Sequence, residues 1–493
     1  MRPVHLIPAG VVLLALGGIA AAAQLAGPAT PGPDRAATAP QQVTVTTATR
    51  ACPPVQGGGS GTVAFIAGSS AASSSAPGQA QLAPLPLAGT VLRALSPITA
   101  TGPGALSMLT TPAAQSASKP GASNKGTTVL QAWSVTASGT MARALEAEEA
   151  TGAGLGSVRC GEPGSDIWFV GPGQQGGAAQ IQLDLMNVDS LPASVDVNVI
   201  TDAGPVQAGA DTGITVPPHQ TVTESLSSLA GGASVTAIEV RTSIGRVAAD
   251  VSESSSHGGT ASWLPSTTAP STQLVIPGVP PTGSNAGLYI VVPGTTNARV
   301  SVLAITAQGK HQPFGTQTVD LPGDSASYVA LTPLGGTAAL ELTANVPVSA
   351  AVLVPGSGLG AFTAATAPIS EQAVVAGNTT GSGLAVTVVL SAPAGPARVR
   401  LTELARTSGA TSSQVVTVAA GHTLTVPATL PRGAKAGSAF AVVITPLAGS
   451  GPLYAARVET QGQNTVVSII PAVSALTTIT LPPVRDSYDA ISP

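Results

Sequence analysis

The sequence repeats one pattern three times at intervals of about 100 residues. The copies read SVDVNVITDAG, RVSVLAITAQG and RVRLTELARTSG, and they place Val195, Val300 and Val399 at equivalent positions. In each copy apolar residues alternate with polar ones, which is the period of a strand with one buried face. A repeat this long does not fit a solenoid and indicates tandem domains.

Each copy contains several short apolar segments separated by Gly, Pro and Ser, and none has a helical period. This pattern is typical of an antiparallel β-sandwich of immunoglobulin-like type. The Cys…Trp…Cys spacing of a true immunoglobulin domain is absent from the sequence. We therefore predict an all-β fold of tandem immunoglobulin-like antiparallel β-sandwich units behind an N-terminal hydrophobic helix.

The period also predicts the domain boundaries. A degenerate copy with long Ser- and Pro-rich insertions precedes the three clear ones. The units are expected to form a rod, with exposed linkers around 257–271 and 359–370. The predicted segments are a degenerate β unit at 51–160, β-sandwich units at 165–256, 271–358 and 370–473, and a C-terminal tail at 474–493.

The N-terminus carries an uncharged apolar segment from Val4 to Ala26. Two interpretations stay open for residues 1–26: a cleaved signal peptide, or a membrane anchor of the roughly 20 residues that a spanning helix needs. Residues 27–50 are rich in Pro, Ala and Thr and predict an extended linker. Either interpretation predicts an extracytoplasmic chain, anchored to the cell membrane through the N-terminal helix or secreted.

Composition argues against a nucleic-acid partner. Charged residues make up 9% of the chain and the net charge is −4, whereas an average soluble protein has about 25% charged residues. The lysines and arginines are scattered singly, so they form no track for a phosphate backbone.

A glycine pattern raises the question of a cofactor. Gly171, Gly173 and Gly176 have the Gly-x-Gly-x-x-Gly spacing of a dinucleotide-binding loop. The equivalent loops, VIPGVPPTGSNAGLYI and VVAGNTTGSGLAVTV, lose this spacing but keep a strand, loop and strand. The segment IQLDLMN after the glycines alternates as a strand, whereas a phosphate site needs a helix N-terminus. We predict a connection between strands, and no cofactor.

Residue patterns for catalysis are also weak. The five histidines lack metal-ligand spacing, and no Gly-x-Ser-x-Gly elbow occurs. The acidic cluster in ALEAEEATG, which consists of Glu146, Glu148 and Glu149, is interpreted as the solvated end of a strand. A second polar group, which consists of Asp184, Asn187 and Asp189, has a spacing that matches no calcium-binding loop. We therefore predict a protein that is not an enzyme and binds no metal.

A carbohydrate-binding module for cell-wall polysaccharide is the alternative function. Sugar sites present aromatic faces, and aromatic residues make up only 2% of this chain. Trp133, Trp168 and Phe169 are candidates, although the last two occupy apolar strand positions that favour core packing. Trp263 lies in a predicted linker. We expect it to wedge between neighbouring units, with contact to a partner as the alternative.

The chain has two cysteines, Cys52 and Cys160, which flank the degenerate unit. In an oxidising compartment an isolated pair usually bonds, so we predict a disulfide between them. Two free or intermolecularly paired thiols are the alternative. The bond requires the chain at Cys160 to return to within about 7 Å of the start of the unit.

The N-terminal segment, RACPPV, RCGEPGSDIWFVGPG and SWLPST together resemble an actinobacterial family of domains of unknown function, number 5719. WFVGPG is the most specific motif, and the resemblance extends from about Cys52 onward. It implies an exported, envelope-associated protein and supplies no catalytic residues. The prediction is a non-enzymatic extracytoplasmic cell-envelope protein with a scaffold or binding role. Its expected partners are the membrane and cell-wall glycan or another envelope protein.

Overall fold

The structure is a computed structural model. The predicted N-terminal helix at 1–26, the first part of the predicted linker and the end of the predicted tail lie outside the described residues. Among the described residues, no helix is long and apolar enough to cross a membrane. The structure describes residues 41–481 except 55–60, 69–77, 90–97, 100–104, 112–114, 118–126, 130, 152–155, 207–212, 230, 256–261, 282–285, 314–317, 356–359, 382, 407–409 and 463–464.

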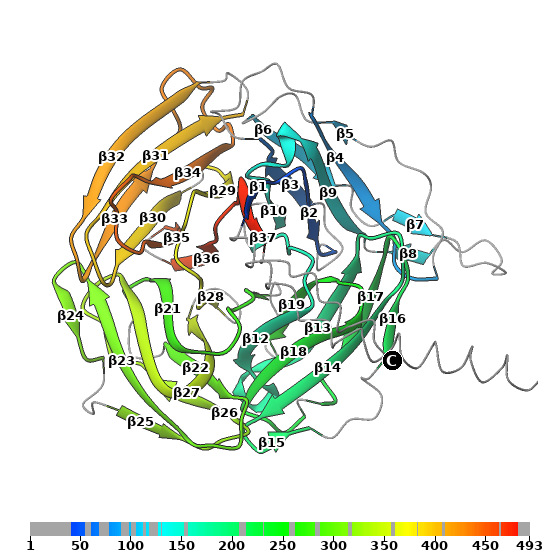
Figure 1. The fold of residues 1–493 in the computed structure, drawn as a ribbon, viewed down its shortest axis with the longest axis vertical. Helices are drawn as coiled ribbons and strands as arrows, with labels where there is room; N and C mark the ends of the chain where they lie inside the picture. The colour runs from blue at the N-terminus through cyan, green and yellow to red at the C-terminus, as the bar shows by residue number, and fades with distance from the viewer. Residues whose placement is uncertain are drawn as a thin grey trace, which may run out of the picture. The chain divides into compact units, whose positions relative to one another are not determined.

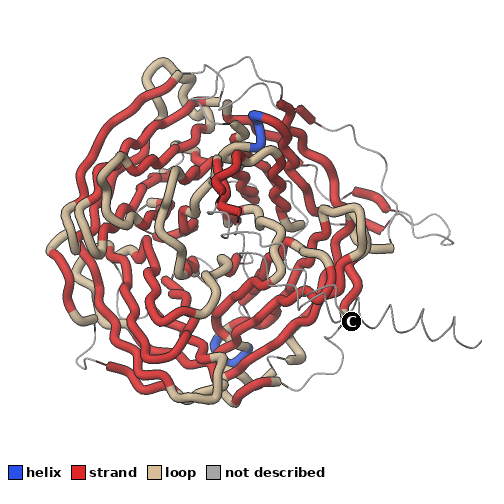
Figure 2. The backbone as a smooth tube through the Cα atoms, in the orientation of Figure 1, coloured by secondary structure: helices blue, strands red, loops and turns tan. Residues whose placement is uncertain are grey.

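The described residues form an all-β protein, as predicted (Figure 2). All pairs of named strands are antiparallel, and the other regular elements of this part are short 3-10 turns such as Thr140–Ala142 and Gln174–Gly176. Alternation of buried and exposed side chains explains the strands. In β31 (Ala397–Ala405), for example, Val399 and Leu401 are buried and Arg400 between them is exposed.

Within the described residues one strand order occurs four times, and we call these copies repeats 1 to 4. The strands are counted here without the hairpin inserted in repeat 1, and the two short strands after the third strand of repeats 2 and 3 are counted together as the fourth. In each repeat the first, sixth, third and fourth strands then form one sheet, and the fifth, second, seventh and eighth form the other. In repeat 3 a single long strand, β27 (Ala338–Val354), serves as both sixth and seventh strand. An apolar core fills the space between the two sheets of each repeat.

The strands of the first two repeats are as follows (Figure 1). Repeat 1 contains β2 (Thr47–Cys52), β3 (Gly61–Ile66), β4 (Gly78–Leu85), β5 (Ile98–Thr99), β6 (Leu106–Thr111), the hairpin β7 (Gln115–Ala117) and β8 (Thr127–Val129), β9 (Ala132–Gly139), β10 (Glu146–Thr151) and β11 (Ser157–Arg159). Repeat 2 contains β12 (Asp166–Pro172), β13 (Ala178–Asn187), β14 (Ala193–Thr201), β15 (Gly204–Pro205), β16 (Ile214–Val216), β17 (Gln220–Ser225), β18 (Val235–Ile244), β19 (Ala248–Ser255) and β20 (Ser262–Leu264).

The other two repeats follow the same plan. Repeat 3 contains β21 (Ser271–Val279), β22 (Gly287–Val292), β23 (Ala298–Thr306), β24 (Gly309–His311), β25 (Thr318–Leu321), β26 (Ser325–Ala330), β27 (Ala338–Val354) and β28 (Ala361–Ala364). Repeat 4 contains β29 (Ala373–Asn378), β30 (Leu384–Ala392), β31, β32 (Thr411–Val418), β33 (His422–Ala428), β34 (Phe440–Pro446), β35 (Tyr454–Gln461) and β36 (Thr465–Ala472).

The repeats also pack on one another, and their interfaces form a closed cycle. Repeat 4 returns to repeat 1, where β29 lies beside β3 and β10 (Figure 1). The expected rod is therefore wrong. The physical reason is that the outer sheet faces are apolar as well, so each needs a partner. The interfaces contain Met186 and Ala248 against Ala51 and Leu85, Trp168 and Val170 against Tyr289 and Val291, Val275 and Ile305 against Tyr454, and Val374 and Ala376 against Ala64 and Ile66.

The segments between repeats are not the exposed linkers that composition suggested. The predicted linker at 257–271 contains β20, and the linker at 359–370 contains β28. Both strands are buried along their whole length and complete a sheet. Repeats 2 and 3 therefore extend beyond their predicted ends.

A further strand pair joins parts of the predicted linker at 27–50 and the predicted tail at 474–493. β1 (Gln41–Thr44) pairs antiparallel with β37 (Thr478–Leu481), with Val43 opposite Ile479. These β-branched residues favour an extended chain. The two strands belong to a compact unit separate from residues 45–477.

Candidate functional site

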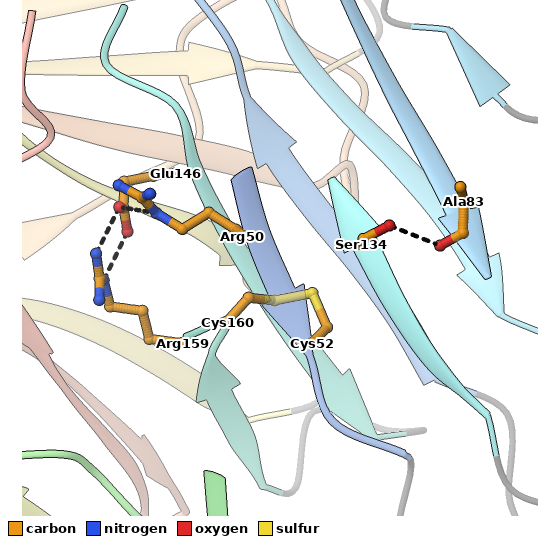
Figure 3. The surroundings of a disulfide bond; sticks show 7 residues. All are labelled: Arg50, Cys52, Ala83, Ser134, Glu146, Arg159 and Cys160. Atoms are coloured by element: carbon orange, nitrogen blue, oxygen red, sulfur yellow. Dashed lines mark hydrogen bonds and ion pairs between the residues drawn. A yellow bond between two sulfur atoms is a disulfide. The ribbon is translucent and has the colours of Figure 1, made fainter. Parts of the chain in front are cut away.

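The predicted disulfide is present. Cys52, the last residue of β2, is bonded to Cys160 directly after β11, with 4.3 Å between the Cα atoms (Figure 3). Ala51 and Gly161 exchange backbone hydrogen bonds of 2.9 and 2.7 Å beside it. The end of repeat 1 therefore returns to its beginning, and both sulfur-bearing residues are fully buried.

A buried ion cluster lies close to the disulfide (Figure 3). Glu146 on β10 accepts hydrogen bonds from Arg50 Nε at 3.0 Å, and from Nε and Nη2 of Arg159, both at 2.6 Å. Glu146 is 1% exposed and Arg50 is 4% exposed. Burial lowers the pKa of Arg159, but the charge and hydrogen bonds of Glu146, together with the charges of Glu162 and Glu148, more than offset this and raise it. The guanidinium therefore stays charged and ties β11 to β10.

A second carboxylate of β10 reaches into repeat 4. Glu148 Oε1 accepts a hydrogen bond from the backbone N–H of Ala376 at 2.7 Å, and Oε2 accepts one from Gly377 at 3.2 Å. Arg457 Nη1 on β35 donates to the same Oε2 at 2.7 Å. One side chain of repeat 1 thus holds two strands of repeat 4, and we call this group the Glu148 clamp.

A β-bulge in β29 makes the clamp possible. The register between β29 and β34 shifts between Val375 and Asn378, so Ala376 and Gly377 are free of the ladder. Their N–H groups turn toward Glu148 instead. Asn378 fixes the bulge, because its Nδ2 donates to the carbonyls of Val375 at 2.9 Å and of Phe440 at 3.1 Å.

Arg457 is the largest fully buried side chain among the described residues, with 0% exposure. Burial lowers its pKa, but the charges of Glu148 and Glu459 more than offset this and raise it. Glu459 Oε2 lies 3.7 Å from Arg457 Nη2. Burial raises the pKa of Glu459, and Arg457 lowers it in part. The ion pair is therefore a structural joint between repeats 1 and 4, and it is closed to solvent.

The interpretation of the acidic cluster as a solvated strand end is wrong. Glu146, Glu148 and Glu149 are only 1–2% exposed. Two of the arginine partners, Arg50 and Arg457, lie 96 and 309 residues away in the sequence, and sequence reasoning missed them. The available signal was a lone arginine inside the apolar run LYAARV.

Two further carboxyl groups face each other where repeats 1 and 2 pack. Asp184 on β13 is directly opposite Asp250 on β19, and both are buried. Thr223 Oγ1 donates to Asp184 at 2.6 Å. Burial raises the pKa of Asp184 to about 6, although the hydrogen bond from Thr223 lowers it in part. Burial, followed by the charge of Asp184, raises the pKa of Asp250 well above its ordinary value, while Arg159 lowers it.

These two carboxyls predict a stability that falls as the pH rises. Between about pH 4 and pH 6 the folded chain keeps a proton on Asp184 that the unfolded chain has released. The difference amounts to on the order of 3 kcal/mol at neutral pH. In urea denaturation between pH 4 and 8, Asp184→Asn should remove the part of the fall in unfolding free energy that comes from Asp184. Thr223→Val should move that fall to higher pH, because it removes a hydrogen bond that lowers the pKa of Asp184. A variant Asp184→Asn with the wild-type pH dependence would contradict the assignment.

The glycine loop connects two strands, β12 and β13, as predicted. Two backbone N–H groups of the loop donate hydrogen bonds within the protein: Gly173 donates to the carbonyl of Ser234 at 3.0 Å, and Gln175 donates to that of Ala233 at 2.8 Å. A Cβ on Gly173 would lie 2.4 Å from the Ala233 oxygen, and one on Gly176 would lie 2.3 Å from the Ser234 oxygen. The glycines thus allow close packing of the loop on residues 233–234.

Gly173→Ala should therefore destabilise the protein by about 1–3 kcal/mol, the usual cost of overpacking. The clashing oxygen belongs to the backbone and is fixed by hydrogen bonds, so it cannot turn aside. Gly294→Ala is the matched control, because a Cβ there meets nothing within 4 Å. Urea denaturation of both variants checks this, and equal stability of the two would refute the packing role.

The aromatic residues considered for sugar binding all lie in the interior. Trp133 and Trp168 are 4% exposed, Phe169 is 0% exposed and Trp263 is 7% exposed. Trp263 belongs to β20, opposite Ser252 of β19. None of these four rings presents an open face in this structure.

The polar residues considered for calcium have other partners. Asn187 Oδ1 accepts a hydrogen bond from the backbone of Asp189, which also pairs with Arg246. Asn187 Nδ2 donates to the carbonyls of Leu191 and Val216. In the part of the chain that the structure describes, no group of three or more His, Cys, Asp or Glu residues is placed to hold a metal ion.

Comparison with known proteins gives one match. The model of a family of unknown function, DUF5719, matches residues 113–429. No curated protein and no solved structure matches the chain. The matched residues cover the end of repeat 1, all of repeats 2 and 3 and most of repeat 4. This is more than half of the chain, and the chain belongs to the family of unknown function DUF5719.

Proposed function

We propose that the chain is a non-enzymatic extracytoplasmic protein of the cell envelope, and that it serves as a rigid scaffold for another envelope component. The observation that carries this proposal is the Cys52–Cys160 disulfide, because such bonds persist in oxidising compartments outside the cytoplasm. In this proposal the N-terminal apolar segment anchors or exports the chain, and each repeat is an immunoglobulin-like sandwich.

The buried charges support a structural role. Both carboxylate oxygens of Glu146, and both of Glu148, accept hydrogen bonds from groups within the protein. Buried and fully paired ions fix the arrangement of their neighbours at the expense of accessibility. These groups join β2, β10 and β11, and they join repeat 1 to repeat 4. A scaffold needs such fixed geometry between its parts.

The location can be tested with one added cysteine. Thr417→Cys places a thiol at an exposed position of β32, while both native cysteines are bonded. A membrane-impermeant maleimide should label this variant in intact cells and leave the unsubstituted protein unlabelled. Labelling only after lysis would contradict an extracytoplasmic location. Crosslinking in the same intact cells, followed by mass spectrometry, then tests the scaffold role: recovery without any crosslinked envelope component would contradict it.

A further inference from the structure

A cavity of about 450 Å³ lies where repeats 3 and 4 meet. It opens to solvent, since Pro281, Thr425 and Pro427 at its walls are exposed. The cavity is separate from the Glu148 clamp and from the disulfide. The lining residues from repeat 4 are Thr387, Val389, Thr425, Pro427, Val458, Thr460 and Val466, and those from repeat 3 are Pro280, Pro281 and Thr337.

The cavity exists because repeat 3 covers only part of the outer face of one sheet in repeat 4. Beside the cavity the two repeats are in contact, because a Cβ on Gly278 of β21 would lie 2.3 Å from the Cβ of Ala456 on β35. Just past this contact, β21 ends at Val279 and is followed by Pro280 and Pro281. In the part of repeat 3 that the structure describes, no strand follows β21 over the remaining sheet face, and the cavity lies there.

The lining runs diagonally across the sheet of repeat 4. In its middle, Thr387 of β30 is opposite Pro427 of β33 on one side and Val458 of β35 on the other. Thr425 of β33 lies two residues further along the strands in one direction, and Val466 of β36, opposite Thr460, lies two residues further in the other direction. With about 4.8 Å between strands and about 3.4 Å per residue, the lining from Thr425 to Val466 is roughly 20 Å long. The shape of the floor therefore favours an elongated ligand.

The chemistry of the lining restricts the ligand further. None of the ten lining residues is charged. Val458 and Val466 provide a buried apolar floor, and threonine hydroxyls from both repeats lie around it. A charged ligand group would lose hydration here without gaining an opposite charge. The lining also has no aromatic side chain on which a sugar ring could stack.

We propose that this cavity is a binding site for a neutral molecule with a linear aliphatic body and a hydroxyl or carbonyl group at one end. The volume lies within the range of small-molecule sites, about 300–1,000 Å³. The aliphatic body lies along the valine floor, and the polar end receives or donates a hydrogen bond at a threonine. This site does not depend on where in the cell the protein acts.

Binding is tested with the purified protein and N-phenyl-1-naphthylamine, an uncharged fluorophore that brightens in apolar sites. We expect saturable fluorescence that 1-decanol displaces. Decanoate has the same chain length with a charged end, and it should compete at least about tenfold more weakly. Absence of saturable fluorescence, or equal competition by decanol and decanoate, would overturn the proposal.

Two variants locate the site. Thr425→Arg in β33 and Thr337→Arg in repeat 3 each place a charge at opposite walls of the cavity. Either should weaken decanol binding at least about tenfold. Thr417→Arg at an exposed position of β32 is the matched control and should bind as the unsubstituted protein does. Unchanged binding in both cavity variants, with circular dichroism showing all three folded, would place the fluorophore elsewhere and refute the site.

Discussion

Replacing Glu148 by alanine should lower the free energy of unfolding by about 3–5 kcal/mol, because the buried Arg457 loses its closest counter-charge. The two amides of the β29 bulge lose their acceptor at the same time. Urea denaturation followed by tryptophan fluorescence and by circular dichroism measures the change. The same loss should appear for Arg457→Ala, which leaves Glu148 buried without its cation.

The double variant Glu148→Leu with Arg457→Met separates pairing from burial. It removes both charges, so its loss of unfolding free energy should be clearly smaller than the sum of the losses of the single substitutions. The exposed pair of Arg299 and Asp320 is the matched control, and Arg299→Met should change stability little because solvent screens that pair. Additive costs in the double variant would show that Glu148 and Arg457 do not act as a pair.

Removing the disulfide should lower the free energy of unfolding by an amount comparable with that of Glu148→Ala. The bond joins residues 108 positions apart, and closing a loop of that length removes unfolded-state entropy worth about 4.7 kcal/mol in the chain-entropy model. Cys52→Ala with Cys160→Ala should lower the free energy of unfolding by about 2–5 kcal/mol in urea denaturation. The oxidised protein should show the same loss after reduction.

Alkylation and mass spectrometry provide the control for that experiment. Without reductant, neither cysteine of the purified protein should be modified, and with reductant both should be. The double alanine variant should be insensitive to reductant. If reduction lowered the stability of the alanine variant equally, the disulfide would not be the cause of the loss.

Local pattern predicted much of the fold. Alternation in VDVNVI and its copies predicted the strands, and the distance between copies predicted the repetition that the strand order shows. The disulfide followed from compartment and from cysteine number alone. The loop at Gly173 was correctly assigned to a strand connection, because the segment after it alternates.

Closure of the cycle was not predictable from the same pattern. Alternation tells which residues share a face of a strand, but it does not tell which strand covers that face. The sequence EAEEAT therefore looked like a surface segment, although repeat 4 covers Glu148. The strands β20 and β28 were missed for a related reason. They are short and lie among Ser, Gly and Pro residues, and only tertiary pairing makes them strands.

The closed cycle depends on the contact between repeats 1 and 4, and one engineered disulfide tests this contact directly. A Cβ on Gly377 would lie 3.8 Å from the Cβ of Ala64, which is the usual separation in a disulfide. Ala64→Cys with Gly377→Cys should therefore form a new bond under mild oxidation, detected as a linked peptide by mass spectrometry. Ala64→Cys with Gly294→Cys is the control and should not link. A folded Ala64→Cys, Gly377→Cys protein whose two new thiols both remain free to alkylate would contradict the closed cycle.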